Sequence, residues 1–264
     1  MDRLQKAVAL AEEKLRARGD SVGLGGVNDI EYKDTKVVSV GSERLAENRV
    51  VAGFGDSIDR ETFRLMRTKV FAKMRANNWR TIAVSTPTLG QGKSTVVANL
   101  AVSASMEVTQ SVLAVDLDLE RPNLHKIFDL HVKKGLSDVI QGRDEVQDVL
   151  VNPGVDRLTI APGGKPLENS SEWLSNPKVQ ALLEEFRTRY RSRFVIYDMP
   201  PILRSDGVLK SIKDFDCSLL VVEDGVNLVD EIKQSIEVMS QTNFLGYVLN
   251  KAPGARAAGQ NSNT

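Results

Sequence analysis

The sequence predicts an α/β protein with a doubly wound, mainly parallel sheet. Short apolar segments rich in β-branched residues alternate along its 264 residues with longer segments that have helical periodicity. The apolar segments are continuous and do not alternate with polar residues, which is typical of parallel strands covered by helices on both faces. A chain of this length can bury a substantial core in one domain and still carry an additional arm.

The first expected element is an amphipathic helix over residues 1–18. Its apolar residues recur near helical spacing at Leu4, Val8, Ala11 and Leu15. Residues 19–48 are polar and weakly patterned, so we interpret residues 1–49 as a helix followed by a linker or loosely attached arm. The helix is expected to pack on its own domain or on a partner, because its polar face mixes acidic and basic residues, unlike a helix that binds a membrane surface.

The main domain is expected over residues 50–251. Helices are predicted over residues 58–76, 93–107, 177–189 and 229–241. Strands are predicted over residues 80–86, 111–116, 158–161, 194–197, 217–222 and 245–250. Ser57 is a suitable cap for the first of these helices, and Pro177 stands at the favoured first helical position of the third. Residues 252–264 are rich in Gly, Ala and Asn, and we expect them to be disordered.

A glycine-containing loop joins strand 80–86 to helix 93–107. It reads Gly90-Gln91-Gly92-Lys93-Ser94-Thr95. Strand, glycine loop, Lys-Ser/Thr and helix form the context of a phosphate-binding loop, or P-loop. Its backbone N–H groups form an anion-binding nest, and the helix N-terminus adds a partial positive charge. The fold class is therefore that of a P-loop NTPase.

Individual roles follow from this context. Lys93 is expected to reach the β- and γ-phosphates of a nucleotide, Ser94 to hold Mg²⁺, and Thr95 to contact the α-phosphate. Pro87 and Thr88 stand where the two common P-loop patterns require glycine and lysine, so the loop fits neither pattern strictly.

Acidic residues stand at the ends of two predicted strands. Asp116 and Asp118 follow one apolar segment, and Asp198 ends another. Ligands of such sheets bind at the carboxyl ends of the strands. With Ser94, we expect Asp116 and Asp198 to hold Mg²⁺. One carboxylate of the Asp116/Asp118 pair is expected to act as general base toward an attacking hydroxyl while the other positions the metal.

Lys93 and the three aspartates are thus the predicted catalytic set. The nucleotide-contacting set is the loop from Gly90 to Thr95 together with Asn250 at the end of the last strand. Arg121 is expected either to contact phosphate or a neighbouring chain, or to be an ordinary surface arginine.

Composition excludes several other classes of protein. Lys+Arg and Asp+Glu both number 35, so no net charge favours nucleic acid, and we expect no nucleic-acid partner. No apolar run approaches the roughly 20 residues of a membrane span. The single cysteine, Cys217, and two histidines rule out a disulfide framework and most metal clusters. We expect a cytoplasmic protein.

Taken together, the motifs resemble the bacterial tyrosine kinases (BY-kinases) of exopolysaccharide and capsule synthesis, a family of deviant Walker P-loop ATPases. The resemblance covers roughly residues 50–250. Its motifs are the loop followed by Asn99-Leu100-Ala101, an apolar run ending in D-x-D at Asp116 and Asp118, and an apolar run ending in D-x-P-P at Asp198-Met199-Pro200-Pro201.

The helix before the loop carries the family's E-x-x-R-x-x-R pattern at Glu61, Arg64 and Arg67. Residues spaced by three lie on one stripe of a helix. In the family this helix joins neighbouring subunits into a ring, so the resemblance implies a homo-oligomer. The N-terminal helix is similar to that of single-chain members, which act with a separate membrane protein.

Three departures from the family pattern bear on function. Glu120 stands where arginine is expected, Leu89 replaces a proline, and the family's C-terminal tyrosine cluster is missing. Three of the four tyrosines, Tyr190, Tyr197 and Tyr247, lie in or next to predicted elements and are expected to be structural. Tyr32, in the polar arm, is either the candidate phosphate acceptor or an ordinary linker residue.

The resemblance implies an ATP-dependent protein-tyrosine kinase with ATPase activity that uses ATP and Mg²⁺. It further implies a membrane-embedded polysaccharide co-polymerase as partner, which recruits the chain to the inner face of the membrane. One alternative is a non-kinase, ATP-dependent switch that assembles with such a partner. Another is a partitioning or division-type ATPase, which Thr88 and the D-x-P-P motif disfavour.

Overall fold

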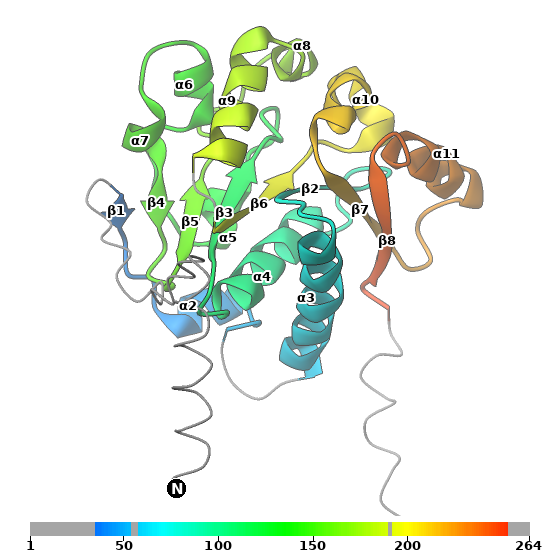
Figure 1. Ribbon diagram of the computed structural model, residues 1–264, viewed down its shortest axis with the longest axis horizontal. Coiled ribbons are helices and arrows are strands. Elements are labelled where there is room, and N and C mark those ends of the chain that lie inside the picture. The colour runs from blue at the N-terminus through cyan, green and yellow to red at the C-terminus, as the bar shows by residue number, and fades with distance from the viewer. Residues whose placement is uncertain (1–34, 54–57, 190–191, 253–264) are drawn as a thin grey trace, which may run out of the picture. The chain divides into compact units, whose positions relative to one another are not determined.

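The computed structural model describes residues 35–53, 58–189 and 192–252. The predicted helix 1–18, Tyr32, Ser57, Tyr190 and all but one residue of the tail 252–264 lie outside these ranges. Within them, the strands form an eight-stranded sheet of order β1-β4-β5-β3-β6-β2-β7-β8. The pairings are parallel except for β4 with β5. The predicted doubly wound, mainly parallel sheet is confirmed (Figure 1).

The strands are β1 (Lys36–Val37), β2 (Thr81–Ser85), β3 (Ser111–Asp116), β4 (Val151–Asn152), β5 (Leu158–Ala161), β6 (Arg193–Asp198), β7 (Cys217–Glu223) and β8 (Asn243–Asn250). The longer helices are α3 (Ile58–Ala76), α4 (Lys93–Ser105), α9 (Pro177–Thr188) and α11 (Val229–Met239). The shorter ones are α2 (Ser42–Glu47), α5 (Leu124–Ile127), α6 (Leu136–Ile140), α7 (Val146–Val149), α8 (Ser170–Leu174), α10 (Asp206–Ser211) and the 3₁₀ turns η1 (Ile202–Arg204) and η2 (Ile212–Asp214).

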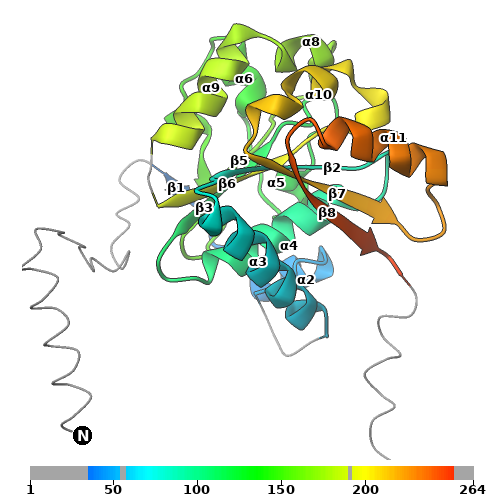
Figure 2. The same cartoon turned by 45° about the vertical axis from the view of Figure 1, so that its right-hand side comes forward.

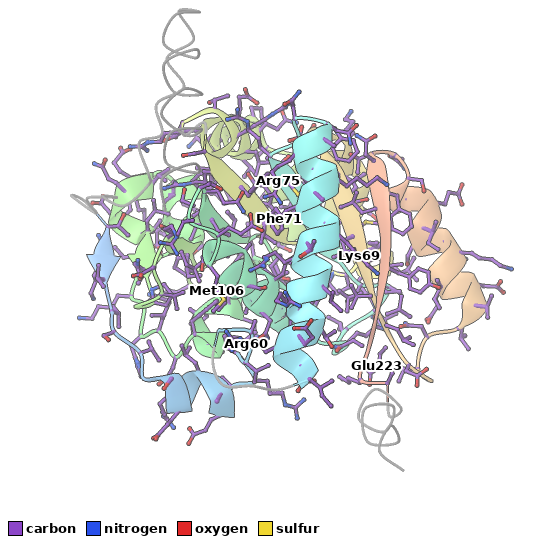
Figure 3. The ribbon with its side chains drawn as sticks, turned by 60° about the horizontal axis from the view of Figure 1, so that its bottom comes forward. Arg60, Lys69, Phe71, Arg75, Met106 and Glu223 are labelled. Atoms are coloured by element: carbon purple, nitrogen blue, oxygen red, sulfur yellow. The ribbon has the colours of Figure 1, made fainter. Side chains whose placement is uncertain are left out.

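Helices cover both faces of the sheet (Figures 1 and 2). An apolar core lies on each of these faces. Helices α3 and α4 cover one face, and α4 is buried on nearly all sides because α3 packs over it. Figure 3 looks onto α3, whose Phe71 is fully buried while Lys69 is exposed. Helices α6, α8, α9, α10 and α11 supply apolar residues to the core on the other face.

The structure differs from the expected linker over residues 35–48. Strand β1 extends the sheet by pairing with β4, and Leu45 of α2 is buried. The following backbone is held by Asn99, whose Oδ1 accepts hydrogen bonds from Val51 N (2.8 Å) and Ala52 N (3.0 Å). The linker interpretation was wrong here because a few isolated apolar residues give no periodic pattern.

The remaining sequence predictions agree closely with the observed elements. Helix α3 spans the predicted 58–76, whereas α4 ends at Ser105 instead of residue 107. In the part of the chain that the structure describes, no helix is both long and apolar enough to cross a bilayer.

Candidate active site

The predicted P-loop connects β2 to α4 in a conformation that requires glycine. Gly90 and Gly92 have φ of +81° and +83°, in the left-handed region that L side chains rarely adopt. A Cβ on Gly92 would lie 2.4 Å from Asn250 Nδ2. That amide donates a hydrogen bond to Gln91 O (2.8 Å), so the end of β8 closes against the loop. Lys251 Nζ adds a bond to Gly90 O (2.9 Å).

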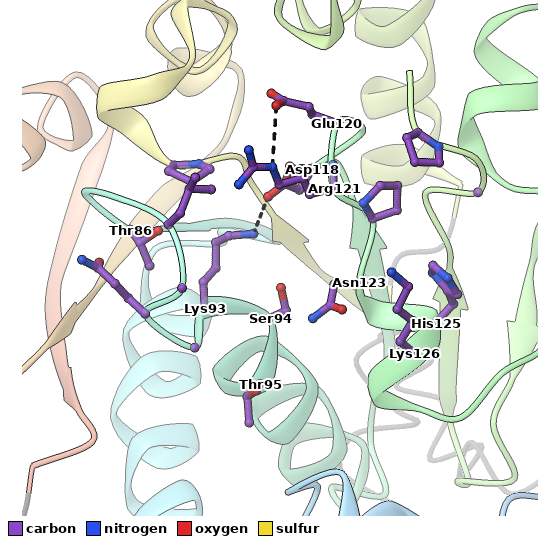
Figure 4. Close-up of a pocket in the computed structure, with 18 residues that line it drawn as sticks. Thr86, Lys93, Ser94, Thr95, Asp118, Glu120, Arg121, Asn123, His125 and Lys126 are labelled. Carbon is purple, nitrogen blue, oxygen red and sulfur yellow. Dashed lines mark hydrogen bonds and ion pairs between the residues drawn. The ribbon is translucent and has the colours of Figure 1, made fainter. Parts of the chain in front are cut away.

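Lys93 is held by two of the predicted carboxylates. Its Nζ lies 2.6 Å from Asp198 Oδ1, and the side chain is 7% exposed. Figure 4 shows its other contact, to Asp118 Oδ2 at 3.2 Å. Burial lowers the pKa of this amine, but Asp198 and Asp118 more than offset that, so the pKa lies above its usual value. Lys93 is therefore charged and points toward the carboxyl ends of β3 and β6.

Asp116 and Asp198 are fully buried and incompletely bonded. Asp116 Oδ2 accepts hydrogen bonds from Asn123 N (2.8 Å) and Leu124 N (2.9 Å), while its Oδ1 has no partner among the described residues. Asp198 Oδ2 likewise lacks a partner there. Burial, followed by repulsion from Asp198, raises the pKa of Asp116 to about 8. Burial also raises the pKa of Asp198.

These atoms fit a divalent cation. Two carboxylates contact the Lys93 ammonium, with the charge of Asp116 close by. The unpartnered oxygens of Asp116 and Asp198 are hard oxygen ligands of the kind that Mg²⁺ prefers. Ser94, in the first turn of α4, lines the cavity above the loop together with Asp118. The structure thus brings together Lys93, Ser94 and all three predicted aspartates.

A cavity of about 740 Å³ opens above the loop. One wall is the loop itself, from Leu89 to Thr95; the other is formed by residues 118–126. Asp118 lines this cavity, whereas Asp116 and Asp198 lie below its surface. The predicted residue Arg121 also lines it, exposed and 3.6 Å from the Glu120 carboxylate.

Sequence reasoning missed Asn123, His125 and Lys126 on this second wall (Figure 4). They belong to or precede α5, a four-residue helix too short to give a periodic pattern. The available signal was position, since the chain leaving Asp116 and Asp118 at a strand end must run along the same edge of the sheet.

The predicted oligomer-interface residues lie away from this cavity and do not share one environment. Glu61 and Arg64 are exposed and hydrogen-bonded to each other (Arg64 Nε–Glu61 Oε2, 2.7 Å). Arg67 instead turns against α4, donating to Ser103 O (2.9 Å), and is 18% exposed. Only the first two present a free surface.

The described tyrosines behave differently from each other. Tyr197 is fully buried in β6, as expected of a structural residue. Tyr247 lies within β8, in the element expected for it, but its side chain is 64% exposed. The exposure follows from its place on β8, the edge strand of the sheet.

Residues 82–263 match the family model for the CobQ/CobB/MinD/ParA nucleotide binding domain. The tyrosine-protein kinase ptk of Acinetobacter johnsonii is 35% identical over 59% of this chain and 21% of that protein. The tyrosine-protein kinase etk of Escherichia coli K12 is 31% identical over 72% and 26%, respectively. The putative tyrosine-protein kinase CapB of Staphylococcus aureus is 27% identical over 73% and 84%. The chain thus spans about a quarter of the first two relatives and most of the third.

Solved structures give the same picture. The chimerical protein CapA2B2 has a TM-score of 0.69 at 27% identity, covering 83% of this chain and 93% of that one. The kinase domain of E. coli ETK has a TM-score of 0.67 at 25% identity over 81% and 88%. MinD of Pyrococcus horikoshii in complex with Mg-ADP has a TM-score of 0.54 at 25% identity over 66% and 71%.

Proposed function

Because the chain belongs to the CobQ/CobB/MinD/ParA nucleotide-binding domain family, and is similar to tyrosine-protein kinases in sequence and structure, we propose that it is an ATP-dependent protein-tyrosine kinase with ATPase activity. The observation that carries the proposal is the buried cluster of Lys93 with Asp118 and Asp198 beneath the loop. Phosphoryl transfer depends chiefly on positioning and on charge neutralisation, and this cluster supplies both.

The loop and Lys93 bind and orient the nucleotide. Backbone N–H groups of residues 90–95 and the N-terminus of α4 face the phosphates. The Lys93 ammonium, pointed at the carboxyl ends of β3 and β6, is placed to contact the β- and γ-phosphates. Asn250, already bonded to Gln91 O, holds the end of β8 beside the loop. Bound Mg²⁺ would add the positive charge that phosphoryl transfer needs, and Ser94, Asp116 and Asp198 are the residues that would hold it.

The three aspartates divide their roles by position. Asp118 is the one that lines the cavity, so it is the carboxylate that an entering hydroxyl can reach. We assign it as the general base, which accepts the proton of the acceptor hydroxyl. Asp116 and Asp198 lie deeper, with one unpartnered oxygen each, and suit metal binding.

The proposal extends to partners. Exposed Glu61 and Arg64 at the start of α3 are the candidate contacts between subunits of a homo-oligomer, whereas Arg67 supports them from within its own domain. The resemblance to BY-kinases supports a membrane-embedded polysaccharide co-polymerase as activator, which would recruit this chain to the inner face of the membrane. Arg64→Ala should weaken self-association; an unchanged mass distribution in solution would refute this contact.

Purified protein incubated with Mg²⁺ and ATP should incorporate phosphate on tyrosine, its own or a partner's. Lys93→Met should abolish nucleotide binding and phosphate incorporation, because the loop loses its only side-chain cation. As a control, Lys178→Met, at an exposed position of α9, should change neither. Mass spectrometry and ATP-binding measurements provide the readouts. Wild-type affinity and turnover in Lys93→Met would overturn the site assignment.

A second candidate is a non-kinase switch in which ATP drives assembly with the same kind of partner. Residues 248–264 contain no tyrosine that could serve as the phosphate acceptor, which favours it. ATP hydrolysis without phosphotyrosine, both with and without the membrane partner, would select this reading.

A further inference from the structure

The part of the second wall beyond Asp118 has no role in the proposed nucleotide chemistry. It runs from Glu120 to Lys126 and carries Arg121, His125 and Lys126 (Figure 4). We propose that this wall is the acceptor subsite and that it selects tyrosines flanked by acidic residues. The inference rests on the proposed kinase function and adds the class of substrate.

Residues 120–126 lie next to the place where the acceptor hydroxyl is expected. Lys93 Nζ, which marks the γ-phosphate end of the loop, contacts Asp118, and the wall continues directly from Asp118. The opposite side of the loop is closed by Asn250 and Lys251, which bond the carbonyls of Gln91 and Gly90. An acceptor hydroxyl that approaches Asp118 therefore places its neighbouring residues along residues 120–126.

The wall carries more positive than negative charge. Lys126 is exposed, and no ion pair to it is found among the described residues. Arg121 pairs with Glu120 at 3.6 Å, but both side chains are more than half exposed, so this ion pair is weak and easily exchanged. The wall thus carries two cationic side chains, Arg121 and Lys126, and one carboxylate, Glu120. Both cations are available to a ligand that bears carboxylates.

His125 adds a polar group that also lacks a partner. Its Nδ1 is buried at the cavity without a hydrogen-bond partner among the described residues. Burial, and then the charge of Lys126, lowers the pKa of the imidazole, so it is neutral at neutral pH. A neutral imidazole can hydrogen-bond a peptide group without adding further charge.

The chain itself contains a segment of the required chemistry. Residues 29–34 read Asp-Ile-Glu-Tyr-Lys-Asp, which places three carboxylates and one ammonium around Tyr32. Such a segment, supplied by a second copy of the chain, is complementary in charge to Arg121 and Lys126. A synthetic peptide of residues 27–36 is therefore the natural probe.

The test is binding of this peptide, fluorescently labelled, to the full chain in the presence of Mg²⁺ and a non-hydrolysable ATP analogue, followed by fluorescence anisotropy. Exposed charge pairs contribute a few tenths to about 1 kcal/mol each, so the double variant Arg121→Ala/Lys126→Ala should raise the peptide Kd by about tenfold. Glu120→Gln should lower it, because Arg121 is then released. Lys178→Ala serves as the matched control.

A second peptide separates charge from shape. Replacing Asp29, Glu31 and Asp34 in the peptide by Asn, Gln and Asn should weaken binding to the wild type about as much as the double variant weakens binding of the native peptide. Equal binding of both peptides, or binding of neither, would overturn the proposal. So would a double variant that weakens the ATP analogue more than the peptide, because the wall would then serve the nucleotide.

Binding in this assay requires no phosphoryl transfer. A chain that binds the acidic peptide selectively but never phosphorylates it would sink the kinase function and leave the subsite standing. A chain that phosphorylates acidic and neutral peptides with equal KM would support the kinase function but contradict the proposed acidic subsite.

Discussion

Aspartates at the two ends of the parallel sheet differ sharply in how completely their carboxylates are hydrogen-bonded. At the amino end, Asp216 Oδ2 accepts hydrogen bonds from Arg80 N (2.8 Å), Thr81 N (2.9 Å) and Thr81 Oγ1 (3.0 Å), while its Oδ1 lies 3.1 Å from Arg187. At the carboxyl end, Asp116 and Asp198 each keep one oxygen without a partner among the described residues.

This difference separates a structural carboxylate from one that awaits a ligand. A buried charge with all its hydrogen bonds made can hold the fold together, whereas an incompletely bonded one is unfavourable until something binds it. Asp216 joins β2, β7 and α9. Asp116 and Asp198 instead repel each other beside Lys93. Such unfavourable electrostatics are typical of carboxylates in a ligand-binding site.

The largest expected effect is on ATP turnover, when an Asp→Asn substitution at the carboxyl end of the sheet is compared with one at the amino end. Asp116→Asn should lower the rate by on the order of 10²–10³-fold, because the proposed metal site loses one of its charges. Asp216→Asn should change it by less than about threefold, since this carboxylate contacts only protein groups. Phosphate release assays on folded protein would measure both. Equal losses of ATP turnover in the two variants would contradict the proposed difference between the aspartates at the two ends of the sheet.

The next effect is a pH dependence of stability without nucleotide or metal. The pKa of Asp116 is raised from 3.8 to about 8 in the folded chain, so between these values the folded state binds more protons at this group than the unfolded state. Stability that is present below the lower value is therefore lost as the pH rises toward the upper one. Asp116→Asn removes this loss, and its advantage over wild type should grow by at most about 1.4 kcal/mol per pH unit.

Denaturant unfolding in EDTA from pH 4 to 9 would measure this difference. A constant offset between the two proteins would mean that the Asp116 carboxyl does not titrate in this range. Asp216→Asn provides the comparison.

At the amino end the expected change has the opposite sign. Asp216→Asn should destabilise the fold by about 2 kcal/mol, because the Arg187 guanidinium loses its shorter ion pair and the amide cannot accept all the hydrogen bonds that the carboxylate accepts. Thermal or denaturant unfolding at fixed pH gives the value. If stability were unchanged, the hydrogen bonds of Asp216 would contribute little and its structural role would be wrong.

The smallest effect compares two glycines at the carboxyl end. Gly92→Ala should cost about 1–2 kcal/mol and weaken nucleotide binding, because the new methyl group collides with the Asn250 amide. Gly225→Ala has a similar φ of +70° and nothing within 4 Å, so it should cost only the backbone strain of about 1 kcal/mol. Should both variants bind nucleotide equally well, the contact between β8 and the loop would not matter for binding.

Much of the carboxyl end could be predicted from the sequence, because strands and acids there are consecutive. An apolar run that ends in Asp116 or Asp198 must deliver its carboxylate to the ligand edge of a parallel sheet. Lys93 follows from its place between a strand and a helix. What the pattern could not give was the depth of each group, and hence that Asp118 alone of the three lines the cavity.

Other features depend on contacts between distant segments and leave no local pattern. Leu45 and Val50 are single buried residues in a polar stretch, and Asn99 of α4 accepts hydrogen bonds from the backbone N–H groups of the next two residues, Val51 and Ala52. Arg67 shares a spacing with Arg64, yet it turns toward Ser103 on the adjacent helix. Such pairings are set by packing, which periodicity does not record.

The most direct test of the central claim is the Mg²⁺ dependence of ADP binding, measured by calorimetry for wild type, Asp116→Asn and Asp216→Asn. We predict that Mg²⁺ strengthens ADP binding to wild type and to Asp216→Asn alike, and that this enhancement falls by on the order of 10–100-fold in Asp116→Asn. The account would be contradicted if Asp116→Asn kept the full enhancement, or if Asp216→Asn lost it.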